Sequence, residues 1–72
     1  MKLSFQIGDL ATISTQFPIR DHKGELCLVM RSFIASNVKT SYDYPAAKVL
    51  IIRTGKETVF NQAWLLMEQP HT

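Results

Sequence analysis

Few residues of this sequence are suited to chemistry: one cysteine, Cys27, and two histidines, His22 and His71. Cys27 lies in an apolar stretch, where a free cysteine usually acts as a small buried hydrophobic residue. It has no metal-ligating partner at the usual short spacing, and a single cysteine excludes a disulfide within the chain. His22 could approach Cys27 from the preceding loop, but so small a domain leaves little room for a substrate pocket. We therefore expect a protein that is not an enzyme, without catalytic residues, metal or cofactor.

Basic and aromatic side chains give a second kind of candidate site. The chain has eight Lys and Arg against six Asp and Glu, with a formal net charge of +2. These cations are scattered and acids lie among them, whereas nucleic-acid modules usually gather Lys and Arg on one face. In a nucleic-acid surface, the cations would contact phosphates and the tyrosines would stack on bases. The candidates for this alternative are Arg20, Lys23, Arg31, Arg53, Lys56, Tyr42 and Tyr44.

Five short β-strands must position these residues. We expect strands over 10–14, 25–33, 46–53, 57–60 and 65–68, which are rich in β-branched and large apolar residues. The polar segments 15–23 and 35–45 are predicted to be long loops. Thr54-Gly55 is predicted to be a tight turn, in which Gly55 takes a positive φ. Asn61 is expected to cap a single helical turn over 62–64.

These elements predict one all-β domain, a small five-stranded barrel that spans 1–72 with an ordered core over about 5–68. Their order resembles that of SH3-like barrels: a long first loop, a second loop, a tight hairpin, and one helical turn before the last strand. The segments Phe5-Gln6-Ile7-Gly8-Asp9-Leu10, Gly24-Glu25-Leu26 and Trp64-Leu65 also resemble very small SH3-like barrel proteins of bacteriophages and marine metagenomes. Those proteins are mostly without assigned function, so this resemblance implies a fold and no activity.

Two segments resemble motifs of known function. Tyr42-Asp43-Tyr44-Pro45 resembles the aromatic motif of peptide-binding SH3 domains. In those domains the motif opens the fold, whereas here it falls between the second and third strands, so we interpret it as a loop. Gly8-Asp9-Leu10 followed by Lys23-Gly24-Glu25-Leu26 loosely resembles KOW-type barrels, which implies nucleic-acid binding. The glycine that KOW barrels usually carry upstream in the loop is missing from 15–22.

Closing the barrel requires each strand to contribute to one interior. We predict that this core contains Ile13, Leu26, Val49, Ile51, Phe60 and Leu65.

The second and third strands carry apolar residues on both faces instead of alternating. A second buried surface is therefore expected, and in so short a chain a partner is the simplest cover. The outward set is predicted to be Val29, Phe33, Leu50 and Ile52. This predicts a protein–protein interaction module that forms a homo-oligomer or binds another protein. The competing interpretation is that Phe5, Trp64 or Met67 folds over this face.

No apolar run approaches the ~20 residues that span a bilayer. The beginning of the chain also lacks an apolar core of signal-peptide length. We therefore expect a soluble cytoplasmic protein that makes no membrane contact.

Overall fold

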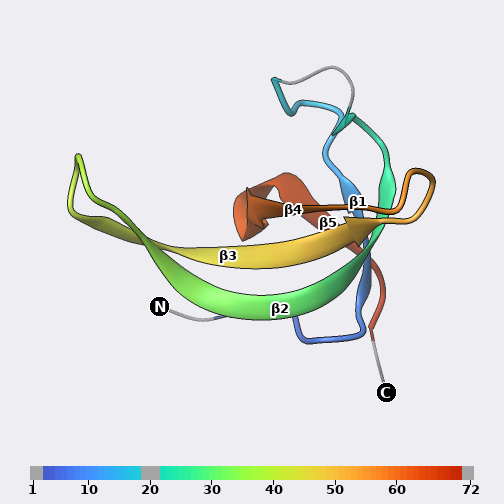
Figure 1. Cartoon of the computed structure of the whole chain (residues 1–72), viewed down its shortest axis with the longest axis horizontal. Coiled ribbons are helices and arrows are strands. Elements are labelled where there is room, and N and C mark those ends of the chain that lie inside the picture. Colours follow the sequence, from blue (N-terminus) through green and yellow to red (C-terminus); the bar gives the residue numbers. More distant parts are fainter. Residues whose placement is uncertain (1–2, 19–21, 71–72) are drawn as a thin grey trace.

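The chain folds into one curved antiparallel sheet, as a computed structural model shows (Figure 1). The structure describes residues 3–18 and 22–70. Across the sheet the strand order is β4-β3-β2-β1-β5. The elements follow one another as β1 (Leu10–Ile13), β2 (Leu26–Asn37), β3 (Tyr42–Ile51), β4 (Lys56–Asn61), the 3₁₀ turn η2 (Gln62–Trp64) and β5 (Leu65–Gln69). The predicted fold, an all-β five-stranded SH3-like barrel with one helical turn before the last strand, is confirmed.

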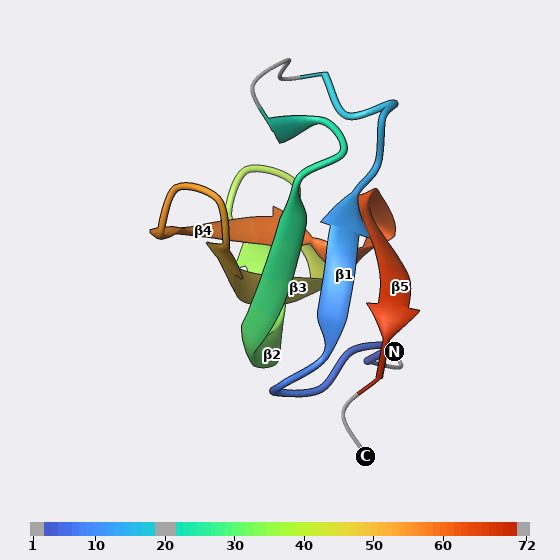
Figure 2. The same ribbon diagram turned by 90° about the vertical axis from the view of Figure 1, so that its right-hand side faces the viewer.

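The long strand β2 belongs to both halves of the sheet. It pairs with β1 near its beginning and with β3 along nearly its whole length. Figure 2 shows β1 lying between β2 and β5. Val29 lies opposite Val49 and Arg31 opposite Lys48, so Met30 is one residue too many for the partner strand. Such a β-bulge bends the strand, and the extra residue reverses which side chains face the interior.

The core lies on the inner face of this sheet and is built from every strand. The predicted core is confirmed except for Leu26, whose side chain is 41% exposed, whereas the neighbouring Cys27 is fully buried. Cys27 lies opposite the buried Ala11, so these two residues share the inner face. The inner face of β2 therefore carries small side chains, and its leucines point outward. The core cluster is Phe5, Ala11, Ile13, Phe17, Cys27, Val29, Ala47, Val49, Ile51, Phe60 and Leu65.

The predicted loop over 35–45 is wrong, because most of it is strand. Pairing of β2 with β3 continues as far as Asn37, which lies opposite Tyr42. The connection is a turn over 38–41, in which Asn37 Oδ1 accepts a hydrogen bond from the Lys39 amide. In Figure 1 this hairpin extends away from β1 and β5.

Pro45 is accommodated within β3 although it has no amide hydrogen. β4 ends at Asn61, which lies opposite Ala46, so at Pro45 the strand has a partner on one side among the described residues. Proline is tolerated on such an edge because no ladder hydrogen bond is lost there. The sequence signal that indicated a loop thus marks the place where β3 becomes an edge strand.

Gln62, the first residue of η2, is buried and its amide is fully bonded. Its Nε2 donates to Ser32 Oγ and to the Ala46 carbonyl, both at 2.8 Å. Its Oε1 accepts from the Ser4 amide at 3.0 Å. These bonds join η2 to β2, to β3 and to the segment before β1. Because η2 connects β4 to β5, the two outer strands of the sheet, Gln62 anchors this connection to the rest of the fold.

Replacing Gln62 by Met should destabilise the fold by about 2–3 kcal/mol, because similar volume is kept while buried polar groups lose their partners. Chemical denaturation measures the effect. Gln69→Met is the matched control, since Gln69 is exposed on β5 and should tolerate the change. Equal stability of the two variants would show that the network contributes nothing.

The turn between β3 and β4 depends on Gly55, which has the predicted positive φ, +72°. Its amide donates to the Ile51 carbonyl at 2.8 Å and closes the turn over 52–55. Gly55→Val should cost at least about 1–2 kcal/mol, because a side chain with a Cβ disfavours this conformation. Apart from Gly55 and its two chain neighbours, no residue has an atom within 4 Å of where that Cβ would be, so the cost is conformational and not steric.

Gly55→Asn separates these causes, because Asn tolerates left-handed backbone better than Val does. In a thermal or chemical denaturation series we expect the order of stability glycine, asparagine, valine. A Val variant as stable as the wild type would contradict the turn geometry.

Candidate functional site

The outward face of the sheet carries a row of leucines. Leu10 lies opposite Leu28, and Leu28 lies opposite Leu50. Each of the three is flanked in the chain by buried residues, so all three point away from the core. Exposed apolar neighbours extend this row at the bulge, at the start of β2 and after the end of β3. We call the set the outer apolar face: Leu10, Leu26, Leu28, Met30, Leu50 and Ile52.

The predicted outward set is partly correct. Leu50 is half-buried and Ile52 is 49% exposed, both on the outer side. Val29 was predicted to point outward and this is wrong: it is fully buried in the core. Phe33 is half-buried, lies beyond the bulge and is covered by Arg31, whose guanidinium carbon is 4.9 Å from the ring centroid. The error follows from the extra residue at the bulge, because the positions of β2 that face the interior shift by one residue beyond it.

None of the three residues suggested as covers lies over the outer apolar face. Phe5 is buried in the core and Trp64 packs against it. Met67 lies opposite the buried Ala11, which assigns its side chain to the inner side of the sheet. None of these three residues therefore covers the leucine row.

An ion pair borders the outer apolar face. Lys48 pairs with Glu57 at 3.1 Å along one border, where Glu57 lies opposite Leu50. Both signs are present on this rim, and its members are exposed or partly exposed. An apolar patch with a polar border is the usual form of a protein-binding surface.

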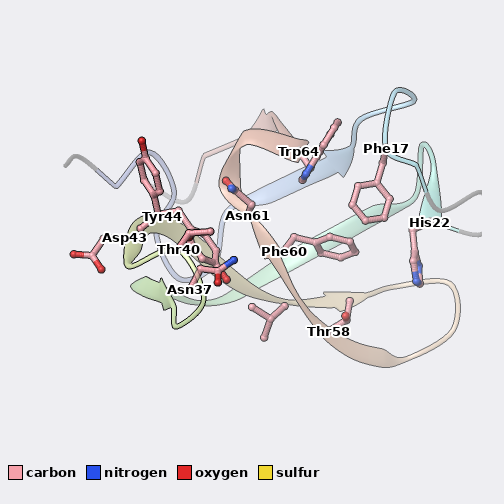
Figure 3. Close-up of a pocket in the computed structure, with 12 residues that line it drawn as sticks. Phe17, His22, Asn37, Thr40, Asp43, Tyr44, Thr58, Phe60, Asn61 and Trp64 are labelled. Carbon is pink, nitrogen blue, oxygen red and sulfur yellow. The ribbon is translucent and has the colours of Figure 1, made fainter.

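A separate hollow of about 620 Å³ lies between the first loop, the β2–β3 hairpin, β4 and η2. None of its lining residues belongs to the outer apolar face. At one end, the Phe17 ring meets Phe60 and Trp64 edge to face, with centroids 5.1 and 5.4 Å apart. Figure 3 shows these rings and His22 at one end of the hollow and Tyr44 at the other.

The residues proposed for nucleic acid do not form one surface. Arg20 lies outside the described residues. Tyr42 and Tyr44 line the hollow, whereas Arg53 and Lys56 line a smaller depression of about 220 Å³ next to it. Arg31 instead stacks on a phenylalanine of β2, and Lys23 is exposed in the turn before that strand.

The sequence analysis did not predict that the residues that complete this hollow come together. Phe17, Phe60 and Trp64 lie on three different elements, which pairing within the chain brings together. The SH3-like order of elements was the available signal, because it places the first loop beside the helical turn.

The thiol of Cys27 is unsuited to chemistry. It is buried and donates to the Ala11 carbonyl at 3.3 Å. Desolvation by burial raises the pKa of this thiol to about 11, so the reactive thiolate is scarce at neutral pH. Within residues 3–18 and 22–70 there is no group of three or more His, Cys, Asp or Glu able to hold a metal ion.

No family model matches this chain, and no curated protein or solved structure is significantly similar to it. The described part of the chain contains no helix of the length and apolarity needed to cross a membrane.

The burial of Cys27 predicts its reactivity. An aromatic disulfide reagent should label the native protein far more slowly than the protein unfolded in denaturant, because the native thiol is both covered and protonated. The raised pKa also affects stability: folding favours the neutral thiol, so stability is retained below the unperturbed value of 9.0 and falls as pH rises toward 11. Equal labelling rates in the two states would contradict this burial.

Proposed function

We propose that this chain is a non-enzymatic assembly module that self-associates through the outer apolar face. The observation that carries the proposal is the unbroken row Leu10, Leu28 and Leu50 on three adjacent strands. Removing apolar surface from water is worth roughly 25 cal/mol per Å². A monomer seldom leaves such a face open, and a partner gives the cover that Phe5, Trp64 and Met67 do not.

A second copy of the chain is the occupant that fits best. A two-fold axis would place the same face of each copy against the other, which is the commonest arrangement of soluble oligomers. An interface in which the leucine row of one copy contacts the leucine row of the other is self-complementary. The Lys48–Glu57 pair provides unlike charges at the rim, so related copies can pair charges instead of opposing them.

The test is the solution mass across a dilution series from about 1 µM to about 1 mM, the range of weak protein association. Wild type should shift from monomer to a defined oligomer as concentration rises. Leu50→Lys should remain monomeric, because it places a charged side chain in an apolar contact. The folded monomer should tolerate this change, since position 50 lies opposite the carboxylate of Glu57.

Val38→Lys is the matched control. Val38 is 92% exposed at the tip of the hairpin and is not part of the outer apolar face, so this variant should associate as wild type does. Circular dichroism establishes that both variants are folded. High salt should leave association intact, because apolar contacts are not screened. A wild type that stays monomeric at the highest concentration, or a Leu50→Lys variant that still associates, would overturn the proposal.

A further inference from the structure

We propose that the hollow of about 620 Å³ is a binding site for a nucleotide unit. The base would stack on the rings of Tyr42 and Trp64, and the phosphate would lie at the His22 end. This inference goes beyond self-association and rests on residues outside the outer apolar face. The ligand chemistry is a planar base joined to a phosphate, as in a free nucleotide or in single-stranded nucleic acid.

The walls of the hollow suit a planar aromatic ligand. Its volume of about 620 Å³ lies within the range of small-molecule sites. Tyr42 is 73% exposed and Trp64 is half-buried, so both present ring surface that the core does not use. Every nucleic-acid base can stack on such rings, and each stacked base contributes roughly 1–3 kcal/mol to the binding free energy.

Two asparagines add hydrogen-bond donors. Asn61 Oδ1 accepts from the Ala63 amide at 2.9 Å, and Asn37 Oδ1 accepts from the Lys39 amide at 3.0 Å. With each carbonyl oxygen engaged, each side chain is oriented with its Nδ2 as the remaining group. Both asparagines line the hollow, where such NH₂ groups match the ring nitrogens and carbonyl oxygens of a base.

The charges around the hollow select an anionic ligand at one end. His22 lines both the hollow and the adjacent depression, which also contains Arg53 and Lys56. Arg53 is engaged by Glu25, whereas Lys56 makes no ion pair with a described residue. Phosphates are held by such cations.

The acid that lines the hollow lies at the opposite end. Asp43 Oδ1 accepts a hydrogen bond from the Ser36 hydroxyl at 2.6 Å. In Figure 3 its carboxylate is turned away from Phe60. The phosphate of a bound nucleotide therefore belongs near Lys56, away from Asp43, and the base near the tyrosines.

Trp64 provides the measurement, because it is the only tryptophan of the chain and lines the hollow. Its fluorescence should be quenched in a saturable way by oligothymidylate of about ten nucleotides, a length within the usual site size. Affinity should fall as salt rises. Thymidine monophosphate is the second probe: saturation at the same nucleotide concentration assigns a free nucleotide, and much weaker binding than the oligomer assigns a single strand.

Two variants distinguish the base site from the phosphate site. Tyr42→Ala should weaken binding about tenfold through lost stacking and leave its salt dependence unchanged. Lys56→Gln should weaken binding and reduce the slope of log affinity against log salt by about one. Lys48→Gln is the charge-matched control, since Lys48 pairs with Glu57 outside the hollow, and should bind as wild type does.

Three outcomes overturn the inference. The first is no quenching by either probe, and the second is binding that neither Tyr42→Ala nor Lys56→Gln weakens. The third is quenching by a proline-rich peptide and not by nucleotides, which would make the hollow a peptide groove. Leu50→Lys should bind thymidine monophosphate as wild type does, because a single nucleotide occupies one hollow whether or not the chain associates, so failure here is distinguishable from failure of self-association.

Discussion

The extra residue in β2 is the constraint on which the rest of the molecule depends. A chain of 72 residues has little apolar material to bury, and β2 must contribute to both halves of the sheet. The bulge at Met30 lets one strand do this, because it bends β2 and reverses its parity. Before the bulge, Val29 faces the core; beyond it, Phe33 faces outward under Arg31. The same arrangement leaves the leucines of β2 outside.

The two outer strands of the sheet are held near each other by contacts of the turn between them and of the first loop. Among the described residues β4 and β5 pair with neighbours on one side each, so no ladder joins them. Gln62, in the turn that links them along the chain, is anchored by hydrogen bonds to three other segments. Phe17 reaches over from the first loop to pack on Phe60 and Trp64. The hollow lies beside this closure, so its shape depends on the same contacts that complete the barrel.

Most of the fold could be predicted from local signals. Gly55 and Asn61 mark the turn and the cap through backbone chemistry that depends on few neighbours, and both predictions are confirmed. Which residues of a strand face the interior could not be predicted in the same way. Leu26 and Cys27 are both apolar, and only the pairing of Cys27 with Ala11 determines which of them is buried. Pro45 suggested a loop because the sequence alone does not reveal where β4 ends.

The candidate sites were less predictable than the fold, because each is made by pairing between distant segments. The leucine row depends on register across three strands, and the hollow joins Phe17 to Trp64 across most of the chain. The two sites share no residue. In a dimer formed through the outer apolar face, both hollows would therefore stay open, and one strand of nucleic acid could engage both. The second contact would then be intramolecular and would strengthen binding without any new interaction. Under the two proposals taken together, association would strengthen the binding of a strand long enough to reach both hollows.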